Sequence, residues 1–125
     1  MKKIFKIAPL VAALACPLIA SADYVDVIEF KLKEGCTMAK YMEIAKDFNT
    51  LYGPQGYTAE IMSQTYGANL DSQIWVGRSK DGTAFGKLYD KWLAGVANAN
   101  SPEGKLGARF GACSTNIARR SYRTR

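Results

Sequence analysis

The side chains that could carry chemistry in this sequence are carboxylates, arginines, tyrosines and cysteines, because its 125 residues include no histidine. Without histidine the chain cannot build a Ser-His-Asp triad or a Cys-His pair. Histidine ligation of zinc or haem is excluded for the same reason. We therefore predict no metal site and assign no cofactor. An enzyme built from this chain would use Asp, Glu, Lys, Arg, Tyr or Ser, or would rely on a bound cofactor.

The first 22 residues have the three-part pattern of a secretory signal peptide. Three lysines precede an apolar stretch over residues 7–19, and small residues follow at Ala20-Ser21-Ala22. The apolar stretch is too short for a membrane span and contains two prolines. We predict cleavage after Ala22. The alternative is lipoprotein processing at Cys16, which would tether the domain to a membrane, although Ala13 stands where a lipobox usually has leucine.

Removal of the leader leaves two cysteines, Cys36 and Cys113. An even number of cysteines in an oxidising compartment indicates a disulfide. Their wide spacing and the absence of a Cys-x-x-Cys motif argue against a redox or metal-binding pair. We predict a Cys36–Cys113 disulfide in a periplasmic or secreted protein that binds no nucleic acid and has no transmembrane segment after cleavage.

The remaining chain, residues 23–125, has the length of one domain. Its apolar residues predict strands over 24–33, 57–66, 73–79 and 114–122. Apolar residues at steps of three and four predict amphipathic helices that start near Thr37 and Thr83 and end near Tyr52 and Val96. We expect residues 105–112 to add one helical turn.

The order strand, helix, strand, strand, helix, strand predicts an α+β fold, the ferredoxin-like βαββαβ sandwich with a four-stranded antiparallel sheet. In this fold the end of the first strand lies beside the start of the fourth, which brings Cys36 and Cys113 together. The same pairing puts Glu29 near Arg119 or Arg120. A shift of one residue in register decides which arginine shares the face of Glu29, and the sequence leaves that choice open.

One face of the predicted sheet packs against the helices, and the other face has no cover within the predicted fold. Residues suited to the helix-covered face are Ile28, Phe30, Leu32, Ile61 and Val76. The other face is expected to carry Val25, Val27, Glu29, Met62, Tyr66 and Trp75. Such a face is too apolar to remain in water. We expect it to be covered by a second copy of the chain, by a ligand or by the chain's own tail.

The strand order, the half-apolar sheet face and the run from Trp75 through Arg78, Phe85 and Trp92 resemble the dimeric α/β-barrel superfamily. This superfamily includes antibiotic-biosynthesis monooxygenase-like, NIPSNAP-like and stress-responsive barrel proteins. The chain is also similar to uncharacterised secreted bacterial proteins with the same placement of cysteines. The resemblance implies a homodimer formed by two sheets face to face, with a small ligand inside. Haem-handling members use a histidine that this chain lacks, which argues against haem degradation and chlorite dismutation.

These observations favour an exported, small-ligand-binding or envelope-associated dimer without histidine-based catalysis. Its predicted pocket consists of Glu29, Met62, Tyr66, Trp75 and Arg120, and its predicted ligand is small and apolar or anionic. Glu29 and the arginine could instead only satisfy each other at the dimer interface.

Two other functions are compatible with the sequence, which does not determine whether the chain is an enzyme. The first is a cofactor-independent oxygenase or isomerase with Glu29 as general base. The second is a structural module that binds anionic envelope components through the basic C-terminus. Its arginines are Arg109, Arg119, Arg120, Arg123 and Arg125. On an edge strand, arginines also serve simply to discourage aggregation.

Overall fold

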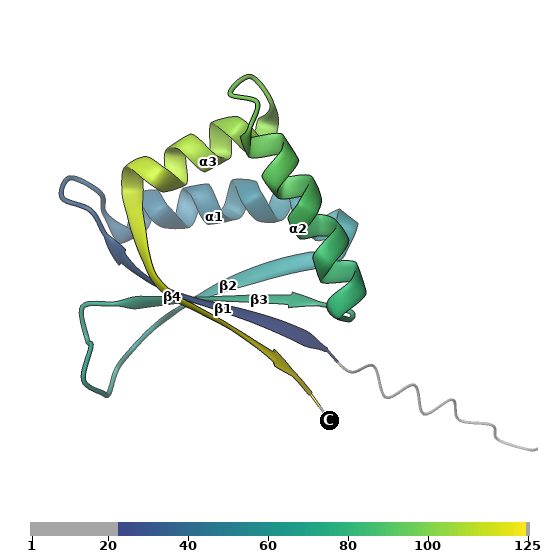
Figure 1. The fold of residues 1–125 in the computed structure, drawn as a ribbon. Coiled ribbons are helices and arrows are strands. Elements are labelled where there is room, and N and C mark those ends of the chain that lie inside the picture. The colour runs from purple at the N-terminus through teal and green to yellow at the C-terminus, as the bar shows by residue number, and fades with distance from the viewer. Residues whose placement is uncertain (1–22, 125) are drawn as a thin grey trace, which may run out of the picture.

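A computed structural model describes residues 23–124, so the predicted signal peptide over residues 1–22 and Cys16 lie outside the described residues. The described chain contains four strands, three α-helices and one short 3-10 helix (Figure 1). In chain order the elements are β1 (Tyr24–Leu32), α1 (Met38–Tyr52), η1 (Gly53–Gln55), β2 (Tyr57–Ser63), β3 (Gln73–Ser79), α2 (Gly82–Val96), α3 (Pro102–Cys113) and β4 (Ser114–Arg123).

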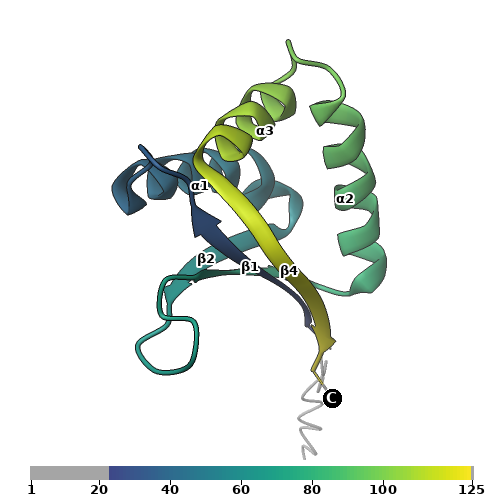
Figure 2. The same ribbon diagram turned by 60° about the vertical axis from the view of Figure 1, so that its left-hand side comes forward.

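The four strands form one antiparallel sheet in the order β2-β3-β1-β4. The first strand therefore lies between the third and the fourth, as the βαββαβ order predicts, and the α+β ferredoxin-like fold is confirmed. All three α-helices lie on the same side of the sheet (Figures 1 and 2). Within residues 23–124 no helix covers the opposite side, which the loop between β2 and β3 reaches at one end through Asp71 and Ser72. We call these two sides the helix face and the open face.

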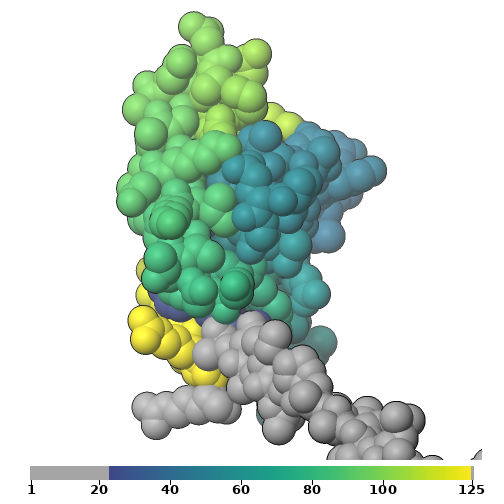
Figure 3. All heavy atoms as spheres, turned by 90° about the vertical axis from the view of Figure 1, so that its right-hand side faces the viewer, coloured from purple at the N-terminus to yellow at the C-terminus, as the bar shows by residue number. Residues whose placement is uncertain are grey.

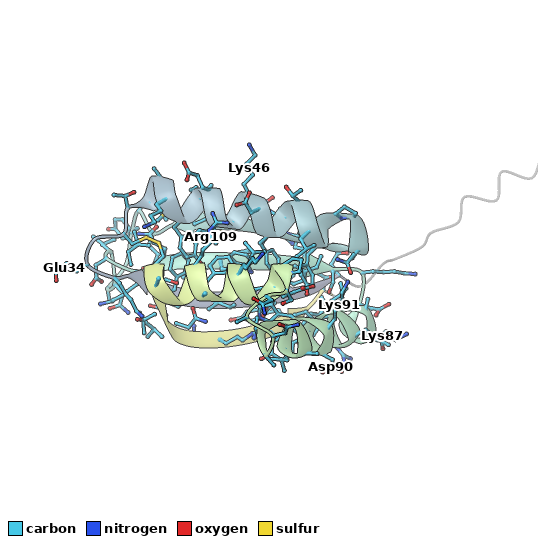
Figure 4. The ribbon with its side chains drawn as sticks, turned by 90° about the horizontal axis from the view of Figure 1, so that it is seen from above. Glu34, Lys46, Lys87, Asp90, Lys91 and Arg109 are labelled. Carbon is cyan, nitrogen blue, oxygen red and sulfur yellow. A yellow bond between two sulfur atoms is a disulfide. The ribbon has the colours of Figure 1, made fainter. Side chains whose placement is uncertain are left out.

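Side-chain caps define where the helices begin. Thr37 caps α1 by accepting a hydrogen bond from the backbone N–H of Lys40 at 3.2 Å. The cap of α2 is Asp81, which accepts from the N–H of Ala84 at 2.8 Å, and not the predicted Thr83. Charged side chains such as Lys46, Lys87 and Asp90 project outward from the helices at the edges of the molecule (Figure 4).

The third helix is much longer than the single turn that the sequence predicts. It spans Pro102–Cys113 and starts at Ser101, whose hydroxyl accepts from the N–H of Gly104 at 2.9 Å. Pro102 occupies the first turn, where a missing N–H costs nothing, so it opens this helix. Helix α3 packs against both α1 and α2 and closes the helix layer over the sheet.

The core between the sheet and the helices is mostly aromatic. Phe48 of α1 is its centre, and its ring contacts five others within about 6.2 Å between centroids. These rings belong to Tyr52, Tyr57, Trp75, Trp92 and Phe110. Most of these contacts are edge-to-face, an arrangement that adds to the stabilisation from burial alone.

A disulfide joins Cys36, in the turn after β1, to Cys113 at the end of α3 (Figure 4). Their Cα atoms are 5.2 Å apart, within the usual range for a disulfide. Next to it, the backbone N–H of Lys33 donates to the carbonyl oxygen of Cys113 at 2.9 Å. The fold therefore brings the two cysteines together as the strand order predicts. Within residues 23–124, no helix is long and apolar enough to cross a bilayer.

The prediction of which β3 side chains face the helices is wrong. Trp75 is opposite Ile28 and Ile61 in the register, and it is buried on the helix face. Val76 is opposite Val27 and therefore belongs to the open face. The sequence Ile74-Trp75-Val76 is apolar at every position, so it has no polar alternation to indicate which residue points inward.

Candidate functional site

A cavity of about 150 Å³ lies between the helix face of the sheet and the three helices. Its apolar lining is Ile28, Phe48, Trp75, Phe85, Leu88, Trp92 and Phe110, together with the rings of Tyr41, Tyr52, Tyr57 and Tyr89. Its polar lining is Asp26, Ser114, Asn116 and Arg119. No residue of α2 is fully buried, which indicates that this helix covers the cavity loosely. In the space-filling view, the surface of α2 (green) lies directly beside that of α1 (blue) (Figure 3).

A buried ion pair forms one wall of the cavity. Asp26 of β1 has 0% of its surface exposed, and both its carboxylate oxygens accept hydrogen bonds from Arg119 of β4. Arg119 Nε donates to Oδ1 at 2.8 Å and Nη2 donates to Oδ2 at 2.7 Å. This two-bond geometry is the strong form of an arginine–carboxylate pair. It fixes the plane of the guanidinium group against the sheet.

The pair continues into a hydrogen-bonded chain across the sheet. The Tyr57 hydroxyl of β2 donates to Asp26 Oδ2 at 3.1 Å and accepts from Trp75 Nε1 at 2.9 Å. This hydroxyl reaches Asp26 by crossing over Gly77 of β3, which is opposite both Asp26 and Ala59. A Cβ atom on Gly77 would overlap the Tyr57 hydroxyl, so only glycine leaves room for this chain.

Aromatic rings hold the other side of Arg119. Its guanidinium carbon lies 4.5 Å from the ring centroid of Tyr89 and 5.6 Å from that of Phe85, within the range of cation–π attraction. Burial acts to lower the pKa of Arg119, but the hydrogen bonds and the charge of Asp26 outweigh burial, and the net pKa is raised. The arginine is therefore always charged. Its side chain is still 38% exposed, so this wall of the cavity can be reached from solvent.

Three tyrosines that line the cavity, Tyr41, Tyr52 and Tyr57, are held in their neutral form. Burial raises the pKa of Tyr41 and of Tyr57, and the charge of Asp26 adds to the effect at Tyr57. Burial, followed by the nearby Glu103, raises the pKa of Tyr52 to about 12. Asp26 uses both its oxygens for Arg119 and Tyr57. These cavity-lining groups are therefore poor general bases near neutral pH.

Comparison with known proteins supports the fold but does not assign the chain to a family. No protein-family model matches the chain, and no curated protein matches it. SnoaB, a cofactor-independent oxygenase from Streptomyces nogalater, is similar in structure with a TM-score of 0.57 and 13% identity, over 83% of this chain and 94% of that one. A hydroxynitrile lyase from Passiflora edulis has a TM-score of 0.55 and 12% identity, over 84% and 95%.

A dimeric protein with a ferredoxin-like fold from Bacteroides fragilis has a TM-score of 0.43 and 12% identity, over 82% of this chain and 94% of that one. At these low identities the similarities concern the fold alone. They agree with the predicted α+β fold.

The predicted pocket residues do not all meet in one place. Glu29 lies on the open face, where it accepts from the Ser72 hydroxyl at 2.9 Å, and Arg120 Nη1 lies 3.9 Å from its Oε2. Met62 is opposite Ile74 on the same face. Trp75 lines the cavity on the helix side instead. Tyr66 lies beyond the end of β2, in the loop to β3, and is 96% exposed.

The two neighbouring arginines are separated by the sheet. Arg120 is opposite Val27 and shares the open face with Glu29, whereas Arg119 is opposite Ile28 and points into the helix side. Arg123 is opposite Tyr24, and Arg109 pairs with Asp47 on the surface of the helices at 2.6 Å. The four described C-terminal arginines therefore do not form a single basic surface, and Arg125 lies outside the described residues. Nor do three or more His, Cys, Asp or Glu side chains gather into a metal site within residues 23–124.

The sequence analysis missed Asp26, the central polar residue of the cavity. A signal for it was present, because Ile28, Phe30 and Leu32 alternate inward and the same alternation continued backward reaches Asp26. A carboxylate on the inward phase of a strand predicts a buried charge with a partner. The paired strand β4 supplies that partner, Arg119.

Proposed function

We propose that this protein is an exported small-molecule-binding protein whose ligand, about the size of one aromatic ring, sits in the cavity on the helix side of the sheet. The observation that carries this proposal is the cavity itself. It has a volume of about 150 Å³, a lining of aromatic rings and one polar wall formed by Asp26 and Arg119. An apolar cavity near 150 Å³ in another protein holds benzene, so the volume suits a single ring.

The protonation states of the lining groups favour binding over acid–base catalysis. Burial keeps Tyr41 and Tyr57 protonated by raising the pKa of each, and Asp26 is already engaged by two donors. A concave, mainly apolar site with a few fixed polar groups is typical of ligand recognition. This support comes from residues on the helix face, which differ from most of the residues that the sequence suggested.

The test uses toluene as a ring-sized probe and the two tryptophans as reporters. Trp75 and Trp92 are the chain's two tryptophans, and both line the cavity. We expect toluene to change their fluorescence in a saturable way and to raise the melting temperature. Leu88→Phe adds volume to the cavity wall and should abolish binding. Leu93→Phe makes the same change on the same helix at an exposed residue and should leave binding intact.

Saturable toluene binding that is lost in Leu88→Phe alone supports the proposal. The absence of toluene binding to the folded wild-type protein contradicts it, and so does binding that Leu88→Phe leaves unchanged. Circular dichroism of each variant establishes that the protein is folded before binding is compared.

The open face supports a homodimer as the working form. Its apolar side chains include Val25, Val27, Ile74 and Val76 across the centre of the sheet, with Met62 and Tyr122 toward its edges. Met62 is 49% exposed in the single chain, and Tyr122 is also exposed. Packing two such faces together would bury this surface, and the Glu29–Arg120 pair would then lie at the interface.

Export is supported by the disulfide, because such bonds persist in oxidising compartments. We propose cleavage after Ala22, with lipid attachment at Cys16 as the alternative, and a periplasmic or secreted location. Intact mass spectrometry of protein purified from both the soluble periplasmic fraction and the membrane fraction distinguishes the two processing routes. A chain beginning at Asp23 supports cleavage, whereas a lipidated chain beginning at Cys16 contradicts it.

The two other functions have less support. A cofactor-independent oxygenase or isomerase with Glu29 as general base would have its pocket on the open face, where Glu29 lies, whereas the cavity lies on the opposite face of the sheet. A module that binds anionic material through the C-terminal arginines would need them on one surface, but Arg119 and Arg120 lie on opposite faces of β4 and Arg109 lies in α3.

A further inference from the structure

We propose that the cavity selects a neutral ring-sized molecule with one strong hydrogen-bond acceptor, such as a ketone carbonyl, and rejects the corresponding carboxylate. This inference rests on the proposed function, because it assigns the class of ligand to the same cavity. Three features of the cavity wall carry it: the charge balance, the one free edge of the Arg119 guanidinium group, and the way that group is held.

The first feature is that the cavity wall is electrically balanced. Asp26 and Arg119 are the charged members of the described lining, and their charges cancel within one ion pair. Behind Tyr52 lie two further charges that are not part of the lining: Glu103 accepts from the Tyr52 hydroxyl at 3.4 Å, and the Lys91 ammonium lies 5.9 Å from the centroid of the Tyr52 ring. A bound carboxylate would lose its hydration and would share one guanidinium group with Asp26. No second positive charge in the lining repays that desolvation.

The second feature is that Arg119 retains one donor edge. Its Nε and Nη2 groups donate to Asp26, and no bond within the described residues engages Nη1. A carbonyl oxygen can accept from Nη1 without bringing a charge into the cavity. The side-chain amide of Asn116, also in the lining, supplies a further neutral group at the wall.

The third feature is that the donor is held before any ligand arrives. Asp26 fixes one edge of the guanidinium group, and the rings of Tyr89 and Phe85 lie within 4.5 and 5.6 Å of its central carbon. Tyr57 in turn donates to Asp26. A donor that loses little freedom on binding gives more of its hydrogen-bond energy to affinity. The hydrogen bond from Arg119 can therefore orient the ring of the ligand at a small cost in conformational entropy.

The experiment compares three probes that share one ring: toluene, acetophenone and benzoate. At neutral pH we expect acetophenone to bind the wild-type protein about tenfold more tightly than toluene, the effect of roughly one hydrogen bond to a charged donor. We expect benzoate to bind at least about tenfold more weakly than acetophenone. Tryptophan fluorescence and calorimetry report all three affinities.

Two substitutions test the role of the charge balance. Asp26→Asn keeps the shape of the side chain but removes its charge, so Arg119 should then favour benzoate over acetophenone. Arg119→Gln removes the guanidinium group and with it the free, charged Nη1 donor, so acetophenone should fall to the affinity of toluene. The matched controls are Asp47→Asn and Arg109→Gln, which change an exposed pair of the same residue types on the helix surface and should alter none of the three affinities.

Toluene separates the two proposals, because it has no hydrogen-bond acceptor. Its binding depends only on the volume and the apolar lining of the cavity. If toluene binds but benzoate equals acetophenone in the wild-type protein, this inference is overturned and the proposed function stands. An unchanged preference in a folded Asp26→Asn variant overturns it as well. If Asp26→Asn does not fold, the wild-type series and Arg119→Gln decide the matter. The failure of every probe, toluene included, rejects the proposed function itself.

Discussion

Gly77 and Tyr57 share one place in the sheet: the tyrosine hydroxyl lies where a side chain on residue 77 would begin. The hydroxyl then reaches Asp26 on the far side of β3 at 3.1 Å. The glycine is therefore part of the polar wall of the cavity, although it contributes no atom to the hydrogen bonds. It acts by being small, and this can be tested directly.

The first prediction concerns that glycine. Gly77→Ala should force Tyr57 out of its position and break its bonds to Asp26 and Trp75, with a loss of about 1–3 kcal/mol in the free energy of unfolding. Urea denaturation measures the change. Gly86→Ala, in α2 with open space around it, is the control and should stabilise the protein by about 0.5–1 kcal/mol. Equal effects of the two substitutions would contradict the packing that we describe.

The second prediction concerns the Tyr57 hydroxyl alone. Tyr57→Phe leaves the ring in the core but removes the acceptor for Trp75 Nε1 and one donor to Asp26. Because buried polar groups then lose a partner, the free energy of unfolding should fall by about 1–3 kcal/mol. Tyr122→Phe removes a hydroxyl from an exposed ring and should change little. A neutral Tyr57→Phe variant would show that the hydrogen-bonded chain contributes nothing to stability.

The third prediction concerns alkaline pH. Burial raises the pKa of Tyr41, Tyr52 and Tyr57 above the ordinary value of 10.0, to about 12 for Tyr52. The folded state therefore retains these protons while the unfolded chain releases them. The free energy of unfolding should be level below pH 10 and should fall as the pH rises from 10 through about 12.

Urea denaturation across this pH range, followed together with tyrosinate absorbance, measures the effect. Tyr52→Phe should make the fall shallower, whereas Tyr66→Phe, at a fully exposed position, should not. If all tyrosines titrate together in the folded protein, before any unfolding, the buried environment that we assign to these three residues is incorrect.

The fourth prediction concerns the disulfide. The bond closes a loop with a sequence separation of 77, which should contribute about 4 kcal/mol by restricting the unfolded chain. Reduction should therefore lower the melting temperature of the wild-type protein. A reducing agent should have no effect on the Cys36→Ser/Cys113→Ser double variant, which is the control for its other actions. Peptide mapping without reduction should recover the linked pair, and free thiols at both positions would rule the bond out.

The fifth prediction concerns the proposed homodimer. Met62→Lys adds a charge to the open face and should shift the protein from dimer to monomer in light scattering. Leu93→Lys makes the same kind of change on α2 at a side chain of similar exposure, 47% compared with 49%, and should leave the dimer intact. A wild-type protein that is monomeric at all concentrations would contradict the pairing of open faces.

Much of the fold was predictable because its signals are local. The alternation Ile28, Phe30, Leu32 marked the inner face of β1, and Thr37 marked the start of α1. The pairing of Cys36 with Cys113 followed from the presence of only two cysteines after the leader, and the strand order agreed with it. Local patterns were less informative for α3, because its glycines weaken the helical signal. The structure explains two of them: a Cβ on Gly104 would meet the backbone of Asn98, and one on Gly107 would press on Val96.

The candidate site was harder to predict because it depends on relations between strands. The side of the sheet on which Trp75 lies follows from its pairing with Ile28 and Ile61, since its own neighbours are all apolar. The choice between Arg119 and Arg120 depends on a β-bulge in β4, where the register shifts between Glu29 and Phe30 of the partner strand. A bulge adds one residue to a strand, and no residue type in β4 indicates where it occurs.

The bulge in β4 has a consequence for how this sequence can change over time. Arg119 and Arg120 are adjacent in the sequence but belong to opposite surfaces of the sheet. Arg119 faces the cavity, and Arg120 lies on the open face. Deleting a single residue between Ser114 and Arg119 would remove the bulge and leave Arg119 opposite Ile28, whereas inserting one would move each arginine to the other surface. Along this stretch, single replacements and a deletion that removes the bulge should therefore be tolerated far more often than insertions.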